Sequence, residues 1–192
     1  LSNFDTSSVN DMSHMFDNAF SLKELNLKNF DTKNVLNMSS MFNYCSGLSI
    51  LDLSQFETGK VKDMSFMFSN TYILREIKID SKKFDTSKVT DMSNMFHYSL
   101  DLQSIDVSNF NTTNVRNMSG MFEDCIGLKT IPLSNFDTSN VIDLSNMFYG
   151  KIKNENSTMI LNYYEKKKHL SFYKGSNINV SSILLDGNTF KL

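Results

Sequence analysis

The chain has 192 residues, a formal net charge of −2 and 40% hydrophobic residues, with no tryptophan and one proline. This near-neutral charge does not favour nucleic acid or an anionic membrane as a partner. No run approaches the roughly 18 apolar residues of a transmembrane helix, and the length allows one or two domains.

One phrase repeats six times in the first 150 residues: F-[D/E/N]-T-x-x-V-x-[D/N]-[M/L]-S-x-M-F. The copies are separated by 26, 26, 28, 26 and 26 positions and begin at Phe4, Phe30, Phe56, Phe84, Phe110 and Phe136. A fixed period in this range predicts a solenoid, in which each unit buries its apolar face only against its neighbours. We therefore predict a single α/β solenoid of about six repeats over residues 1–150.

Between the phrases, the pattern L-x-x-[L/I]-x-[L/I/V] predicts one short parallel strand in each repeat, because its last residues alternate with period two. Five such segments are present: Leu22–Leu27, Leu48–Leu53, Leu74–Ile79, Leu102–Val107 and Leu128–Leu133.

Within the phrase, Val9, Met12 and Phe16 are spaced at i, i+3 and i+7, with Met15 beside them. This spacing is typical of a helix that buries one stripe, so the sequence predicts a short helix or 3₁₀ segment in each repeat. Two helical turns are marginal alone, and packing would have to hold them.

The combined phrase L-x-x-L-x-L-x-x-F-D-T-x-x-V-x-[D/N]-M-S-x-M-F-x-x-C resembles the BspA-like leucine-rich repeat, including its mycoplasma-type form of unknown function. The match runs from Leu1 to about Gly150. The resemblance implies a bacterial cell-surface or secreted location and a role in adhesion or host interaction. It carries over no catalytic residue.

The chain begins at Leu1, which stands three residues before Phe4 as Leu27 stands before Phe30. These residues contain no signal peptide. We expect a fragment cut within a repeat, whose location is extracellular or at the cell surface by the resemblance alone.

The repeat code stops after Gly150, and the last residues carry seven Lys against three acidic residues. Strands are predicted within Ser157–Tyr164, at His169–Tyr173 and at Val180–Leu185, with a hairpin turn at Asp186–Gly187 leading into Asn188–Leu192. We predict that residues 151–192 form an irregular β cap over the sheet edge. The alternative is a linker or the start of a following β domain.

The outward positions of the predicted strands form the first candidate binding face. It comprises Glu24, Asn26, Ile50, Asp52, Arg75, Glu76, Lys78, Asp106 and Pro132. Energetic hot spots favour Trp, Tyr and Arg, and only Arg75 qualifies. Weak or multivalent binding is the most that this face predicts.

A second candidate edge comes from Tyr44 and Tyr98, which share one repeat column after the Met-Phe pair. Structural packing of partly buried rings explains these tyrosines better than binding does.

Three other chemistries fit the sequence less well. Two columns of Asp, Asn and Glu could hold Ca²⁺, but they lack a Gly-rich calcium signature, and turn formation explains them better. The three His do not cluster with Cys at metal-ligand spacing. Cys45 and Cys125 occupy a column of small residues three repeats apart, which is too far for a disulfide and predicts buried thiols.

The sequence therefore predicts a non-catalytic protein-interaction or adhesion module with no cofactor, no metal and no catalytic residue, and a monomer. A protein or glycan ligand, such as one on a host surface, would be its partner. The alternative is a structural spacer or a targeting module that presents a domain outside this sequence.

Overall fold

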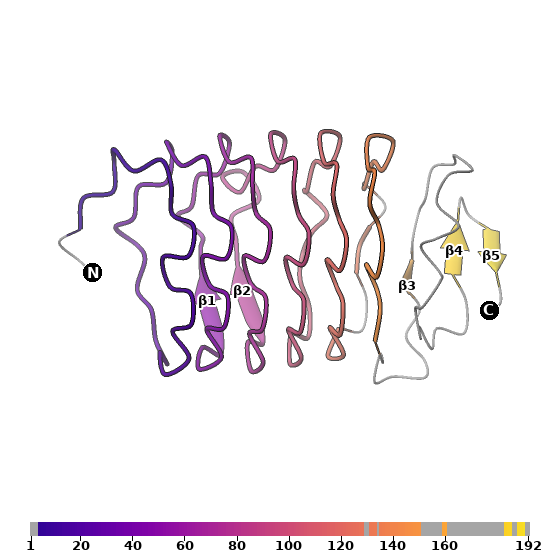
Figure 1. Cartoon of the computed structure of the whole chain (residues 1–192), viewed down its shortest axis with the longest axis horizontal. Coiled ribbons are helices and arrows are strands. Elements are labelled where there is room, and N and C mark those ends of the chain that lie inside the picture. Colours follow the sequence, from indigo (N-terminus) through magenta and orange to yellow (C-terminus); the bar gives the residue numbers. More distant parts are fainter. Residues whose placement is uncertain are drawn as a thin grey trace.

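Each repeat forms one coil, and successive coils lie side by side along the long axis of the molecule (Figure 1). The computed structural model describes residues 4–128, 131–133, 135–150, 159–160, 183–185 and 188–190. Isolated parallel β-bridges hold the coils in register at one position of the phrase. They join Asp11 to Asn37, Asn37 to Asp63, Asp63 to Asp91, Asp91 to Asn117 and Asn117 to Asp143.

The predicted α/β leucine-rich-repeat solenoid, with a strand and a helix or 3₁₀ segment in every repeat, is wrong. The described residues contain no helix, and among the coils only β1 (Ile50–Asp52) and β2 (Glu76–Lys78) form strands. These two strands pair in parallel, with Leu51 opposite Ile77. The remaining coils are built from tight turns and extended segments.

Left-handed residues explain why no helix forms in the phrase. Twelve positions have φ between 53° and 115°, in two columns of the repeat: His14, Ser40, Phe66, Asn94, Gly120, Asn146; Asn18, Tyr44, Asn70, Tyr98, Asp124, Gly150. An α-helix of L-residues cannot contain such conformations at every fourth position. The i, i+3, i+7 spacing therefore reflects a chain of turns, such as the bond from Met15 N to Met12 O (3.3 Å).

These turns aim alternate amides at the neighbouring coil. His14 N donates to Ser39 O (3.0 Å), and Phe16 N donates to Met41 O (2.9 Å). The same pairing recurs in the following coils, as in Phe68 N to Met95 O (2.9 Å). A helix would consume these donors internally, whereas the turns use them to bind coil to coil.

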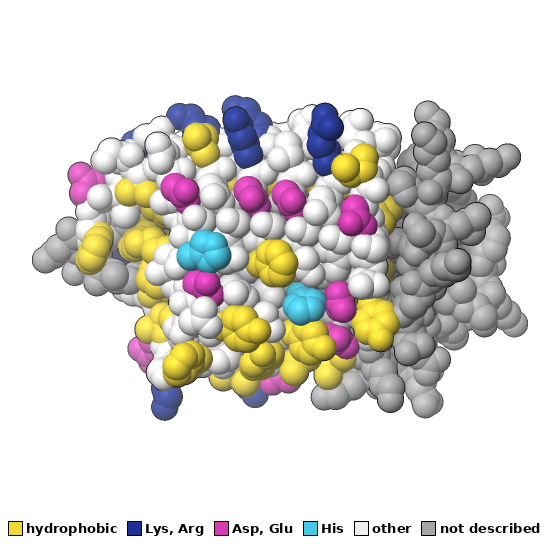
Figure 2. All heavy atoms as spheres, viewed as in Figure 1, with side chains coloured by type: hydrophobic (Ala, Val, Ile, Leu, Met, Phe, Trp, Pro, Cys, Tyr) yellow, Lys and Arg dark blue, Asp and Glu magenta, His cyan; other side chains and the backbone are white. Residues whose placement is uncertain are grey.

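The shape of the turn, which recurs in every coil, also depends on its polar side chains. Asp11 Oδ1 accepts from Ser13 N at 2.8 Å, and Asp63 Oδ1 accepts from Ser65 N at 2.8 Å. Figure 2 shows acidic side chains spaced along this face of the stack. These bonds confirm the turn interpretation of the acidic columns.

Threonine links each turn to the next coil. Thr32 Oγ1 donates to Glu57 O (3.0 Å) and accepts from Glu57 N (2.8 Å). Thr86 makes the same pair of bonds with Asn111, at 3.0 and 2.8 Å. Each hydroxyl therefore satisfies a backbone donor and a backbone acceptor at once.

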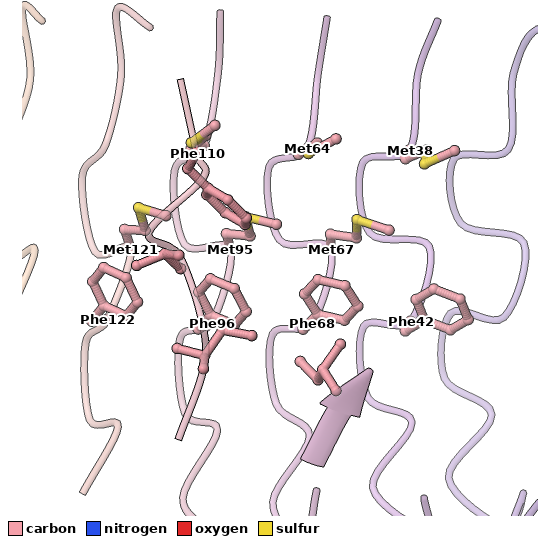
Figure 3. Packing of buried hydrophobic residues seen from close by; sticks show 14 of the residues in the cluster. Met38, Phe42, Met64, Met67, Phe68, Met95, Phe96, Phe110, Met121 and Phe122 are labelled. Atoms are coloured by element: carbon pink, nitrogen blue, oxygen red, sulfur yellow. The ribbon is translucent and has the colours of Figure 1, made fainter. Parts of the chain in front are cut away.

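The core is a row of stacked phenylalanines flanked by methionines (Figure 3). Rings of the Met-Phe pair stack from coil to coil with centroids 5.4 to 5.8 Å apart, along Phe16, Phe42, Phe68, Phe96, Phe122 and Phe148. Met41, Met67 and Met95 are fully buried beside them. The predicted inward orientation of the Met-Phe pair is confirmed in the second to sixth repeats, whereas Met15 of the first repeat is exposed.

The last described elements form a second sheet. It contains β3 (Met159–Ile160), β4 (Ile183–Leu185) and β5 (Asn188–Phe190); β3 pairs with β4 in parallel, and β4 with β5 antiparallel. The predicted hairpin is confirmed by the pairing of Leu185 with Asn188. The strand predicted at His169–Tyr173 lies outside the described residues, and the capping role stays a prediction.

Candidate functional site

The strand-side candidate face is exposed at all nine predicted positions: Glu24, Asn26, Ile50, Asp52, Arg75, Glu76, Lys78, Asp106 and Pro132. Strands β1 and β2 bring its centre together, with Ile50 opposite Glu76 and Asp52 opposite Lys78. The amide and hydroxyl of Ser54 lower the pKa of Asp52, and the charge of Lys78 adds to this effect. Charges of both signs thus lie side by side on this face, and Ile50 is its one large exposed hydrophobic side chain.

A different surface gathers most of the exposed aromatic side chains. We call it the aromatic edge; it consists of the turn that follows each Met-Phe pair, residues 17–21, 43–47, 69–73, 97–101, 123–127 and 149–150. Its large exposed hydrophobic residues are Phe20 (67%), Tyr44 (40%), Ile73 (42%), Tyr98 (39%) and Tyr149 (38%). Figure 2 shows hydrophobic side chains following one another along the lower border of the face.

Backbone conformation presents Tyr44 and Tyr98 to the outside. Both have φ of 55°, the left-handed conformation, so their side chains leave the turn away from the stacked core. Tyr44 packs edge-on against Tyr72 with ring centroids 6.4 Å apart, and Tyr98 packs against His97 at 4.5 Å. Tyr44 and Tyr98 therefore each pack against a neighbouring ring and still expose about two-fifths of their surface.

The sequence pattern missed Tyr72 and Tyr149. They occupy different repeat columns from Tyr44, and only the path of the turn brings all of them to one edge. The signal was present in composition, because each turn after the Met-Phe pair, apart from residues 123–127, carries an aromatic residue outside the repeat code.

A network of side-chain hydrogen bonds links the turns that carry these rings. Asn43 Nδ2 donates to Asp17 Oδ1 (3.0 Å), and Asn70 Nδ2 donates to Asn43 Oδ1 (3.2 Å). Asn70 Nδ2 also bonds Ser69 Oγ (2.9 Å), which lies 3.3 Å from His97 Nδ1. The network crosses four coils and fixes the turns that carry the tyrosines.

The aromatic edge is acidic. Its sequence contains four carboxylates (Asp17, Asp101, Glu123 and Asp124) and no Lys or Arg. Burial raises the pKa of Glu123, and the nearby charge of Asp124 raises it further. Asp124 also raises the pKa of the Tyr98 hydroxyl through its negative charge.

The cysteines have the environment of structural thiols. Cys45 Sγ donates to Phe16 O (3.1 Å), and Cys125 Sγ donates to Phe96 O (2.9 Å), each in the preceding coil. Burial raises the pKa of Cys45 to about 12 and raises that of Cys125 as well. Both are free thiols, as predicted, and neither is poised to act as a nucleophile.

Among the described residues, no group of three or more His, Cys, Asp or Glu could hold a metal ion. The same part of the chain has no helix with the length and apolarity needed to cross a bilayer.

The architecture is that of a repeat protein whose coils are joined by backbone hydrogen bonds and side-chain stacking. The chain matches the family described as Mycoplasma protein of unknown function, DUF285, over residues 1–76 and 71–182. It therefore belongs to this family. Searches of curated proteins and of solved structures find no match.

Proposed function

We propose that this chain is a non-catalytic interaction module of a bacterial cell-surface or secreted protein, in the manner of the BspA-like repeats that its phrase resembles. The aromatic edge is its binding surface, and a protein is its partner. The observation that carries this proposal is the run of exposed residues Phe20, Tyr44, Ile73, Tyr98 and Tyr149 on one side of the stack.

The chemistry of the edge supports this assignment. Tyrosine is enriched at binding hot spots because its ring offers contact area at a small entropy cost, and its hydroxyl offers a hydrogen bond. The hydrogen bonds of Asn43, Asn70 and Ser69 hold the turns in place in the unbound chain. Such preorganisation lowers the entropic cost of binding.

The strand-side face is the weaker candidate. Its side chains are polar and carry opposite charges next to each other, as Asp52 does opposite Lys78. Exposed pairs of this kind contribute little binding energy. We therefore use this face as the source of control variants.

A spacer is the second candidate function. The unbroken series of backbone bonds between coils, such as His14 N to Ser39 O at 3.0 Å and Asn94 N to Ser119 O at 2.8 Å, favours a stiff body that could present another domain. A spacer would not need an exposed aromatic surface, so the two functions differ in what they predict for tyrosine variants.

The test is an array of extracellular-matrix and cell-surface proteins probed with the purified chain. Two substitutions, Tyr44→Asn and Tyr98→Asn, remove the rings but keep the turn, because Asn18 and Asn70 already occupy the same left-handed column. Ile50→Ser is the matched control, since Ser104 occupies its column on the strand face.

We expect specific binding by the native chain, loss of that binding in the double tyrosine variant, and retention in Ile50→Ser. An array without any bound protein would favour the spacer. Binding that Ile50→Ser abolishes and the tyrosine variant preserves would move the site to the strand-side face.

A further inference from the structure

We propose that the aromatic edge recognises a cationic peptide segment, with a Lys or Arg side chain that pairs with Glu123 and Asp124 while its stem lies along Tyr98 and Tyr149. This inference rests on the proposed interaction function and specifies the chemistry of the partner.

Neighbouring coils bring these four residues to one place. Tyr98 N donates to Glu123 O (2.9 Å), and Asp124 N donates to Tyr149 O (2.7 Å), so the three turns follow one another directly. Tyr98 and Tyr149 expose 39% and 38% of their surface. Toward the right of the lower border, Figure 2 shows acidic side chains next to hydrophobic ones.

Charge complementarity selects the occupant. The described residues form one ion pair of a Lys with a carboxylate, Lys33 with Asp31, and one His–carboxylate contact, His14 with Asp17. Neither involves Glu123 or Asp124. The turns of the aromatic edge contribute no Lys or Arg of their own. Among the described residues no Lys or Arg pairs with these two adjacent carboxylates, so they repel each other, and burial of Glu123 adds to the cost of its charge.

A Lys or Arg side chain would satisfy both halves of this surface. Its charge would relieve the repulsion between the carboxylates, and its stem or guanidinium plane would pack on tyrosine rings. The same charges disfavour nucleic acids, sulfated glycans and anionic lipid surfaces, because each would bring more negative charge to Glu123 and Asp124.

The experiment measures fluorescence anisotropy of a labelled peptide in which lysine alternates with serine, titrated with the full chain. A peptide with glutamate in place of lysine is the charge-reversed probe. The test variant is Glu123→Gln with Asp124→Asn, which keeps the size of both side chains and suits the left-handed backbone at Asp124 (φ 53°). Melting curves verify that each variant is folded.

The matched control is Glu24→Gln with Asp106→Asn, which removes the same net charge from the exposed strand-side face. We expect about tenfold weaker binding of the lysine peptide by the test variant, because two partly exposed ion pairs are lost. The control variant should change the binding by no more than about twofold. Added salt should weaken native binding.

Three results would overturn the inference: equal weakening by the control variant, equal binding of the glutamate peptide, or no binding of the lysine peptide by the native chain. Array binding that depends on Tyr44 and Tyr98 but survives Glu123→Gln with Asp124→Asn would sink this inference and leave the interaction function standing. If no protein on the array binds the chain, the proposed interaction function itself is wrong.

Discussion

The ring of Phe68 lies almost parallel to that of Phe42, with an angle of 1° between their planes and 5.8 Å between their centroids. On its other side Phe68 stacks on Phe96 at 5.5 Å. Phe68 therefore contacts the rings of the coils on both sides of it. Such nearest-neighbour contacts are what stabilise repeat proteins.

Replacing Phe68 with Ala should lower the free energy of unfolding by about 3–5 kcal/mol, because it opens a cavity in a close-packed core. Chemical denaturation measures the change. Lys78→Ala, on the exposed side of β2, is the control and should stay within about 0.5 kcal/mol. Equal losses in the two variants would contradict the stacking account.

Gly120 tests the left-handed turns. Its φ is 60°, and an added Cβ would meet the side chain of Asn94 in the preceding coil. Gly120→Ala should cost about 1–2 kcal/mol of stability, since L-residues other than Asn and Asp are disfavoured there.

The control for this substitution is Gly59→Ala. A Cβ at Gly59 would have Asp85 Oδ2 at 3.4 Å as its nearest neighbour, an ordinary contact. This variant should be neutral or stabilising by up to about 1 kcal/mol, because alanine restricts the unfolded chain. Denaturant midpoints of the two variants give the comparison, and an equally stable Gly120→Ala would argue against the left-handed turn.

The inward residues could be predicted from the sequence, but the shape of the coil could not. Periodicity identified Leu51, Leu53 and Phe68 as buried, and the structure confirms them. The helix prediction failed because the spacing of Val9, Met12 and Phe16 fits a helix as well as a chain of turns. Backbone bonds to the neighbouring coil decide between the two, and such bonds are not visible in one repeat.

A sequence signal for the turns was nevertheless present. Eight of the twelve left-handed positions hold Asn, Asp, Gly or His, the residues that tolerate this conformation best. They are His14, Asn18, Asn70, Asn94, Gly120, Asp124, Asn146 and Gly150. The candidate site was likewise found only in part, since Tyr44 and Tyr98 share a column while Tyr72 and Tyr149 reach the edge through the path of the turn.

The thiols provide a probe of coil opening. Because burial raises the pKa of Cys45 to about 12, the thiolate that reacts with alkylating reagents is scarce in the folded chain near neutral pH. We expect negligible labelling by iodoacetamide under native conditions and rapid labelling in denaturant, measured by mass spectrometry. Modification of Cys45 or Cys125 at the rate of an unfolded peptide would contradict their placement between coils.

His97 should make stability depend on pH. Its half-buried position lowers the pKa of the imidazole below its ordinary value, and the charge of Asp124 opposes this effect only in part. The unfolded chain therefore binds the proton more readily. The contribution of His97 is fully present above about pH 6.5 and is lost as the pH falls through the lowered pKa of the folded state.

His97→Asn isolates this contribution, because Asn43 already occupies the same column and bonds its neighbours along the network. We expect the denaturant midpoint of the native chain to decrease as the pH is lowered from about 7.5 to about 5.5. The midpoint of the variant should decrease less over the same range. All other ionisable groups are common to both proteins, so the difference between the two curves reports His97. A variant that loses as much stability as the native chain over this range would show that the imidazole of His97 is as easily protonated in the coil as in the unfolded chain.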